Sequence, residues 1–363
     1  MKILFVLHYP PPVHGSAIVG LQIKDSKIVN EAFDCKYVNL GTSISVDEIG
    51  KGKIIKLFRY FTIFWRIFRS VISNRPDLCY FSITAKGIPF YKDALLVLLV
   101  KLLGIKVVYH FHNKGVRDMQ NKLFDNVLYR LVFKYSNVIL LSKHLYHDIQ
   151  KYAIKEQVYY CQNGIPAIEI MQNKKEAESA VEVLFLSNLI ESKGIFVLLE
   201  VCKLLQHRKI IFHCTIVGGI GDVDEHQLRS KLQEMDLINQ VNYEGKKLGT
   251  EKEEVFANTD IFIHPTLNDC FPLVILEAMQ YSLPVVSSIE GGIPDIVEDG
   301  VTGYLVPKKD VETLAEKLEV LINNPELRHR MGKAGRQKYE REFTLKIFEQ
   351  RLKSTLQQII EKR

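Results

Sequence analysis

Short apolar runs alternate with segments of helical periodicity along almost the whole chain. The first series of runs lies at 2–7, 35–39, 78–81, 106–111, 137–141 and 157–160. A second series follows at 183–187, 210–218, 241–244, 261–264, 284–288 and 304–306. Strands that alternate with helices form βαβ units and a mostly parallel sheet. We therefore predict an α/β fold with two doubly wound parallel sheets.

A polar segment at 167–181 separates the two series. Its part from 172 to 179 carries several charges and almost no large apolar residue, so we predict a linker. This gives a first domain at 1–166, a second at 182–343 and a final helical segment at 344–363. Ligands of open parallel sheets bind beyond the carboxyl ends of the strands. Two such domains that face each other would therefore hold the active site in the cleft between them.

The composition is that of an ordinary globular protein. Apolar residues make up 47% and charged residues 25% of the 363 residues, which argues against a disordered or collagen-like chain. The most apolar stretch, 94–105, is interrupted by Lys101 and is shorter than the roughly 20 residues that span a bilayer. We expect no transmembrane helix. The apolar run at 3–7 is too short for the core of a secretion signal.

The six cysteines are spread widely and include no C-x-x-C pair. Their spacing favours neither a zinc site nor a redox pair nor a dense disulfide framework. A reducing cytosol is the compartment that fits best.

Charge is divided unevenly along the chain. Residues 1–166 contain 23 Lys+Arg and 11 Asp+Glu, a balance of +12, whereas the remainder contains 25 and 31, a balance of −6. The first domain is therefore expected to meet an anionic partner. Nucleic acid is a poorer explanation, because no nucleic-acid-binding motif accompanies the charge.

Much of this positive charge lies at 51–75, which holds seven basic residues and no acid. At roughly 100° per residue, large apolar side chains gather on one side of a helix and basic ones on the other. The apolar side is Leu57, Phe61, Phe64, Trp65, Phe68, Val71 and Ile72, and the basic side is Lys56, Arg59, Arg66 and Arg69, interrupted by Ile55 and Ile63. The pattern suits a helix in an anionic lipid interface. It suits equally a helix packed on the sheet with a solvated basic face.

Two loops that follow strands of the first domain carry candidate residues. The loop at 8–16 passes through three prolines to Gly15, where a helical pattern starts. A glycine there lets the backbone approach a ligand, and a helix N-terminus favours an anion. An ordinary tight turn explains the loop as well. At the end of the run 106–111, the alternation of side chains along a strand places His110 and His112 on the same side. One of the two is expected to face the cleft. The alternative is that the histidines are structural.

In the second domain, Lys193-Gly194 follows the run 183–187 and starts a helical segment. An ammonium group would then lie where backbone N–H groups converge, so phosphate is the natural ligand. A solvated lysine at a helix start is the alternative. The glycine-rich stretch 218–221 lacks the G-x-G-x-x-G spacing, so we exclude a dinucleotide fingerprint.

The loop that follows the run 261–264 turns into another helical pattern. The backbone amides of Leu273 and Val274 are free to donate to a diphosphate. Asp269 and Glu277 supply carboxylates that accept hydrogen bonds from sugar or ribose hydroxyls. A further glycine-containing loop on the same side, 291–295, follows the next strand.

In this order the motifs resemble the family-4 retaining glycosyltransferases of the GT-B type. The matching features are Pro-Pro-x-x-Gly at 11–15, His112, Asn163-Gly164-Ile165, Lys193-Gly194, the acid-x7-Glu loop at 269–277, Gly-Gly-Ile-Pro-Asp at 291–295, Gly300 and Gly303. The resemblance extends over nearly the whole chain and is strongest from 183 to 343. It implies two Rossmann-like domains that face each other across a cleft. The first would bind the acceptor and the second the nucleotide sugar, with a final helix returning to the first domain and with neither a metal nor a cofactor.

The resemblance also implies roles for individual residues. Lys193 matches the lysine that grips the donor diphosphate, and Glu277 matches the carboxylate that binds the ribose. Asp269 matches the acid that holds the transferred sugar, and His112 matches the histidine near the anomeric carbon. Gly15 matches a glycine near the donor phosphates.

Four positions depart from the family pattern. Ser16 stands in place of a second glycine, Asp269 in place of glutamate and Cys270 in place of glycine. Asn188 stands where the family usually has an arginine, which removes one positive charge from the leaving-group site. The expected catalytic residues are His112, Asp269 and Lys193, and the expected donor-binding residues are Gly15, Asn188, Lys193, Leu273, Val274 and Glu277.

The resemblance thus implies a retaining hexosyltransferase that moves a sugar from a nucleotide sugar, with UDP favoured, to a lipid-linked glycan. Its product would be a surface polysaccharide such as capsule or lipopolysaccharide. We expect a cytoplasmic protein, peripheral on the inner face of the cell membrane, that binds anionic lipid and no nucleic acid. The alternatives are a sugar-nucleotide epimerase or phosphorylase of the same two-domain plan, and a non-catalytic partner subunit of another glycosyltransferase.

Overall fold

The computed structural model describes residues 1–11, 14–41, 53–168 and 180–362, with the side chains of 53–57 left out. The chain divides into two compact units. The first is Met1–Gly164 together with Leu345–Arg363, and the second is Ile165–Thr344. Each contains one six-stranded sheet, and every strand pair in both sheets is parallel.

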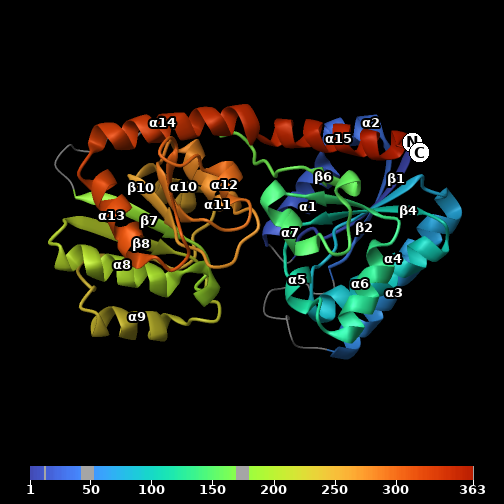
Figure 1. The fold of residues 1–363 in the computed structure, drawn as a ribbon, viewed down its shortest axis with the longest axis horizontal. Helices are drawn as coiled ribbons and strands as arrows, with labels where there is room; N and C mark the ends of the chain where they lie inside the picture. Colours follow the sequence, from blue (N-terminus) through green and yellow to red (C-terminus); the bar gives the residue numbers. More distant parts are fainter. Residues whose placement is uncertain (12–13, 42–52, 169–179, 363) are drawn as a thin grey trace. The chain divides into compact units, whose positions relative to one another are not determined.

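The first sheet has the strand order β2-β1-β3-β4-β5-β6. It lies in the blue-to-green part of the ribbon in Figure 1. Its strands are β1 (Lys2–Leu7), β2 (Asp34–Asn39), β3 (Leu78–Phe81), β4 (Lys106–Phe111), β5 (Asn137–Leu140) and β6 (Val158–Tyr160). β3 and β4 are buried almost throughout, as expected for strands covered on both faces. The chain reverses its direction across the sheet between β1 and β3, which makes the carboxyl ends of these strands a topological switch point.

Helices cover both faces of this sheet. They are α1 (Gly15–Asp25), α2 (Lys27–Ala32), α3 (Lys53–Asn74), α4 (Gly87–Leu102), α5 (Val116–Met119), α6 (Leu123–Phe133), α7 (Tyr146–Ile149) and α15 (Leu345–Glu361). Right-handed crossovers put α3, α4 and α6 on the face opposite α1 and α2. The C-terminal helix α15 packs on α2, and Arg351 Nη1 donates to the carbonyl of Gln162 at 3.1 Å.

Helix α3 packs on its own sheet through an aliphatic stripe. Ile63, Ile67 and Val71 are buried, and the helix contacts α4, β1 and β2. The sequence pattern was wrong about this inner face, because it put Ile63 on the basic side and Val71 on the aromatic side of the helix. Packing on the sheet does not bury the aromatic side chains of Phe61 and Trp65, which remain exposed. The predicted positions of Ile55, Lys56 and Leu57 lie outside the described side chains.

The second sheet has the order β12-β11-β10-β7-β8-β9. Its strands are β7 (Val181–Leu186), β8 (Phe212–Val217), β9 (Val241–Tyr243), β10 (Ile261–His264), β11 (Val285–Ser288) and β12 (Gly303–Val306). Here the reversal lies between β7 and β10, the strand order of a dinucleotide-type doubly wound sheet. All twelve predicted runs coincide with strands, so the prediction of two parallel α/β sheets is confirmed.

The helices of the second unit are α8 (Ile195–His207), α9 (Glu225–Glu234), α10 (Thr250–Ala257), α11 (Leu273–Gln280), α12 (Ile293–Ile296), α13 (Val311–Ile322) and α14 (Pro325–Glu342). Val181, the last residue of the predicted linker, is instead the first residue of β7, and 169–179 lies outside the described residues. The units meet in sequence at Gly164/Ile165 and Thr344/Leu345. No helix in the described ranges combines the length and the apolar character needed to cross a membrane.

Candidate functional site

Three side chains meet at the switch point of the second sheet. Lys193 ends a short turn (Glu191–Lys193) after β7, His264 is the last residue of β10, and Asp269 lies in the loop that follows. Lys193 Nζ donates to Asp269 Oδ2 at 2.6 Å, and His264 Nε2 lies 3.3 Å from the same oxygen. The structure therefore brings together two predicted residues that are 76 positions apart, and it adds His264, which the sequence did not single out.

The turn that carries Lys193 is joined closely to the loop after β10. Gly194 has φ 86°, and a Cβ built on it would lie 2.0 Å from the carbonyl oxygen of Pro265. The N–H groups of Leu267 and Asn268 both donate to the carbonyl of Ser192, at 2.9 and 3.1 Å. Only glycine permits this approach, so Gly194 fixes the position of the turn that carries Lys193.

We predict that Gly194→Ala lowers the free energy of unfolding by about 2 kcal/mol, because it combines a left-handed backbone with a steric clash. Gly300→Ala is the matched control, since Gly300 has φ 75° but nothing within 4 Å of its added Cβ. The control should lose only the backbone part, about 1 kcal/mol. Urea unfolding measures both. Equal losses would mean that the contact with Pro265 costs nothing.

Asp269 is a permanently ionised group. Burial by itself raises the pKa of this carboxyl, but the hydrogen bond from His264 and the charge of Lys193 outweigh burial and lower the pKa to about 2. The other carboxylate oxygen accepts from the N–H of Cys270 at 2.9 Å. Asp269 can therefore accept hydrogen bonds from sugar hydroxyls but cannot act as a general acid near neutral pH.

The loop after β11 supports the loop of Asp269. Glu290, only 5% exposed, accepts from the N–H of Asp269 at 3.3 Å and is paired with Lys308 Nζ at 2.8 Å. The N–H of Gly292 donates to the carbonyl of Cys270 at 2.6 Å. The sequence predicted only a glycine-containing loop at 291–295 here. These contacts show that the loop after β11 packs against the loop that carries Asp269 and stabilises it.

Glu277 lies farther along α11 and does not join the Lys193 cluster. Its carboxylate is paired with Lys252 Nζ of α10 at 2.8 Å. Leu273 and Val274 are the first two residues of α11, where backbone N–H groups have no partner within the helix. Of the predicted donor residues, Leu273, Val274 and Glu277 thus lie on α11, whereas Lys193 lies on the turn after β7.

Asn188, where the resemblance implies an arginine, has a basic neighbour. Its Oδ1 accepts from the N–H of Gly219 at 3.2 Å. A Cβ built on Gly219 would lie 3.3 Å from that oxygen and 3.6 Å from Cδ of Lys246, so the two side chains flank the same glycine. The three residues follow β7, β8 and β9 in turn. The sequence did not single out Lys246, because it belongs to no motif.

In the first unit, the two predicted residues lie at the carboxyl end of the sheet. Gly15 is the first residue of α1, and His112 directly follows β4. The rings of His110 and His112 are 4.3 Å apart, which confirms that they share a side of the strand. His110 is fully buried and His112 half-buried. Burial lowers the pKa of His112 to about 3, so its imidazole is neutral near neutral pH.

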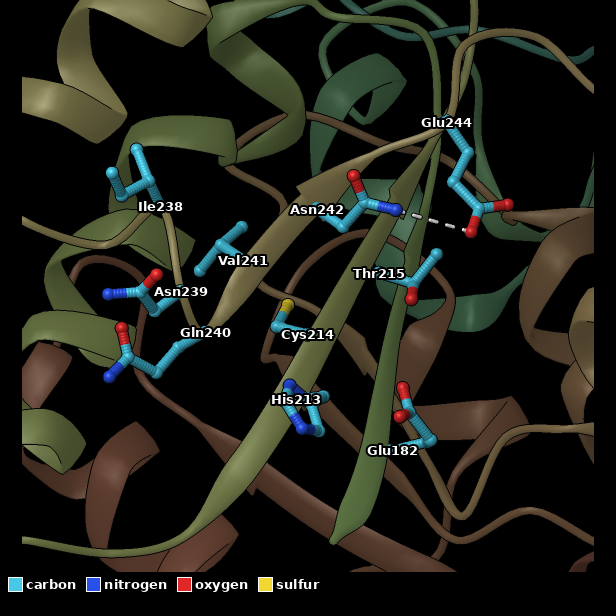
Figure 2. A pocket seen from close by; sticks show the side chains of 10 residues that line it. All are labelled: Glu182, His213, Cys214, Thr215, Ile238, Asn239, Gln240, Val241, Asn242 and Glu244. Atoms are coloured by element: carbon cyan, nitrogen blue, oxygen red, sulfur yellow. Dashed lines mark hydrogen bonds between the residues drawn. The ribbon is translucent and has the colours of Figure 1, made fainter.

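Elsewhere in the second unit, a hollow of about 340 Å³ is lined by the start of β7 and by β8 and β9. Figure 2 shows the side chains that line it. Within it, Asn242 Nδ2 donates to Glu244 Oε1 at 3.4 Å. None of the predicted site residues lines this hollow. Among the described residues there is also no group of three or more His, Cys, Asp or Glu side chains that could hold a metal ion.

Comparison with known proteins gives a family match in the second unit. Residues 167–338, which include the Lys193 cluster and α11, match the family described as "Glycosyl transferases group 1". WcaL of Escherichia coli, provisionally named a colanic acid biosynthesis glycosyltransferase, is 26% identical over 70% of this chain and 64% of its own length. The amylovoran biosynthesis glycosyltransferase AmsK of Erwinia amylovora is 33% identical over 49% of this chain and 45% of its own length. The chain thus spans less than two thirds of the length of either relative.

The whole chain also has the fold of a solved structure. Anabaena HepE, crystallised in complex with UDP and glucose, superposes with a TM-score of 0.72 at 18% identity, over 99% of this chain and 100% of that one. The predicted GT-B fold is thereby confirmed. The match to the glycosyl transferases group 1 family covers residues 167–338, which lie in the second unit.

Proposed function

We propose that the protein is a retaining, family-4 type hexosyltransferase that moves a sugar from a nucleotide sugar to a lipid-linked glycan during surface-polysaccharide assembly. The observation that carries the proposal is the Lys193–Asp269 pair at the switch point of the second sheet, followed in the chain by the start of α11. The names of WcaL and AmsK support a polysaccharide product. The UDP bound to HepE supports UDP as the nucleotide.

The charges of the site suit the breaking of a sugar–phosphate bond. Positive charge builds up on the sugar and negative charge on the departing diphosphate, so a cation and free amides near the phosphate stabilise the transition state. Lys193 and the amides of Leu273 and Val274 would act on the diphosphate. Asp269, ionised at all relevant pH values, would hold hydroxyls of the transferred sugar.

Retention of configuration requires no strong protein base in this scheme. The acceptor hydroxyl would attack on the face that the diphosphate leaves, and a phosphate oxygen would take its proton. The low pKa values of Asp269, about 2, and of His112, about 3, agree with this, since neither group binds a proton readily at neutral pH. His112 would instead donate or accept a hydrogen bond near the anomeric carbon.

The test is transfer from a UDP sugar to a lipid-linked acceptor, with the product's anomeric configuration read by NMR. A product of inverted configuration would refute retention, and a product formed without acceptor would indicate an epimerase. A phosphorylase would require free phosphate. Thermal shifts with UDP and GDP identify the nucleotide, because a ligand at 100 times its dissociation constant stabilises a protein by about 2.7 kcal/mol.

A non-catalytic partner subunit remains the second candidate, favoured by Asn188 and Asp269 in place of the family's arginine and glutamate. Donor hydrolysis by the purified chain alone separates the two proposals. Measurable release of UDP from the donor supports a catalytic subunit. Release that appears only after a second glycosyltransferase is added supports the partner role.

Lys246 is predicted to replace the charge missing at Asn188. Lys246→Gln should weaken binding of free UDP about 5-fold, the factor that corresponds to about 1 kcal/mol for an exposed charge near phosphate. Lys247→Gln is the adjacent control, because Lys247 is already paired with Glu244 at 2.9 Å. Calorimetry measures both affinities. The assignment is wrong if the two substitutions weaken UDP binding equally.

The proposal includes a cytoplasmic location at the inner face of the membrane, where a lipid-linked acceptor would be met. Its support is the basic first unit and the exposed aromatic residues of α3. In the proposed arrangement the protein is held by lipid headgroups and by apolar side chains in the interface, without a spanning helix.

A further inference from the structure

The helices α3, α4 and α6 lie side by side on one face of the first sheet (Figure 1). The central helix, α4, is tied to both neighbours. Tyr60 Oη of α3 donates to the carbonyl of Lys92 at 2.8 Å, and Tyr91 Oη donates to Asp125 Oδ1 of α6 at 2.9 Å. The outer surfaces of the three helices therefore form one continuous face of the unit.

The outer surface of α4 is an apolar stripe. Ile88, Leu95 and Leu102 follow one another at intervals of seven residues, which places them on one side of the helix. They are 68%, 59% and 86% exposed. The opposite side, with Phe90, Val97 and neighbouring residues, is buried against the sheet. The outer stripe is therefore not part of the hydrophobic core of the first unit.

Both neighbours extend this stripe with large apolar side chains. On α3, Phe58, Phe61 and Trp65 are each more than half exposed. On α6, Phe124 and Leu131 lie seven residues apart and are each at least half exposed. The full set that we call the three-helix face is Phe58, Phe61, Trp65, Ile72, Ile88, Leu95, Leu102, Leu123, Phe124, Val127 and Leu131.

On the three helices, the charged side chains that are exposed to solvent are basic. Their acidic residues are Asp93 and Asp125, and both are buried and hydrogen-bonded, to the N–H of Thr84 and to Tyr91 Oη. Their basic residues include the exposed Arg66, Arg69 and Arg130. A face that combines apolar side chains with positive charge alone complements an anionic lipid surface.

The exposed apolar side chains of the second unit are not clustered in this way. Its exposed large apolar residues in the described ranges are Ile211, Ile220, Ile238, Leu248, Ile289, Val301 and Val320. They are all aliphatic and are spread over loops and separate elements. Single exposed apolar residues are ordinary on protein surfaces, whereas a contiguous apolar patch marks an interaction site.

We propose that the three-helix face is a single interfacial surface that lies flat against an anionic bilayer. The proposal rests on the proposed function, in which the acceptor is lipid-linked, and it extends the lipid contact from α3 to α4 and α6. Pairing with a second copy through this face is disfavoured, because two surfaces of the same positive charge would then meet.

Flotation of the full chain with vesicles tests the proposal without an activity assay. We expect binding to vesicles that contain phosphatidylglycerol, weak binding to pure phosphatidylcholine vesicles, and release in 1 M salt, where the Debye length is about 3 Å. Leu95→Gln with Leu102→Gln, on α4 alone, should weaken partitioning at least 10-fold. Ile238→Gln with Val320→Gln, on the second unit, is the matched control and should leave it unchanged.

Arg66→Gln with Arg69→Gln should weaken partitioning about 30-fold, since each basic residue near an anionic surface contributes about 1 kcal/mol. Because all substituted side chains are exposed, unchanged thermal unfolding confirms that the variants fold. Unaltered flotation of the α4 variant would overturn the three-helix face, and so would a concentration-dependent dimer that the same variant abolishes. Transfer to a detergent-solubilised acceptor is measured separately, so failure of the lipid surface leaves the proposed function standing, and the reverse also holds.

Discussion

Lys193→Ala is expected to lower kcat/KM for sugar transfer about 10- to 150-fold. A hydrogen bond to a charged group contributes roughly 1.5 to 3 kcal/mol, and this one would act on the leaving diphosphate as its charge develops. The ammonium group is held at 2.6 Å from Asp269, and the turn that carries Lys193 ends directly before Gly194. The loss should therefore appear in kcat more than in KM, because the interaction strengthens in the transition state.

Lys203→Ala is the matched control for this experiment. Lys203 lies on α8 of the same unit, and its Nζ donates to Gln206 Oε1 at 2.8 Å. The substitution removes an equal charge from the unit but leaves the switch point intact. Steady-state kinetics measure kcat and KM of both variants and of the parent protein. Identical kinetics of Lys193→Ala and the parent protein would show that Lys193 does not act on the diphosphate.

The strands could be predicted from sequence because their signal is local. A buried parallel strand is a short, nearly continuous apolar run, and each of these runs is bounded by polar or glycine-containing segments. The position of Lys193 was also predictable, since it follows such a run and directly precedes Gly194. Its contacts with Asp269 and His264 were not predictable, because these residues come from a different strand and loop and meet Lys193 only when β7 and β10 pair.

Supporting residues were missed for the same reason. Glu290 and Lys308 hold the loop of Asp269, yet neither belongs to a recognisable motif and each comes from a different part of the chain. Lys252, the partner of Glu277, lies on α10, 25 positions away. Ion pairs between distant elements depend on tertiary packing, which periodicity does not report.

Helix α3 shows the limit of the periodicity argument itself. Apolar residues cover most of its circumference, so the pattern could not tell which part faces the sheet. The structure buries the β-branched stripe of Ile63, Ile67 and Val71 and leaves Phe61 and Trp65 outside. Branched aliphatic side chains pack well on a pleated sheet surface. The aromatic residues thereby become available to the three-helix face.

Asp269 and Glu277 are expected to differ in what their loss does to nucleotide binding. In the described structure Asp269 is the partner of Lys193, whereas Glu277 is the partner of Lys252. An incoming diphosphate would compete with Asp269 for Lys193. Asp269→Asn therefore frees the ammonium group, so free UDP should bind as tightly as before or more tightly. Glu277→Gln removes a carboxylate assigned to the ribose and should weaken UDP binding about 10-fold, or about 1.4 kcal/mol.

Sugar transfer should fall with both substitutions, but for different reasons. Asp269→Asn should lower kcat about 100-fold, because the ionised carboxylate that holds the sugar is gone while the nucleotide still binds. Glu277→Gln should act mainly through KM for the donor. Calorimetry with free UDP and steady-state kinetics with the donor measure the two effects, and Glu316→Gln, an exposed charge on α13, controls for the change in net charge. Since the pKa of Asp269 lies at about 2, the contrast should persist across the neutral pH range. An equal loss of UDP affinity in Asp269→Asn and Glu277→Gln would mean that the two carboxylates do not divide the sugar and the nucleotide between them.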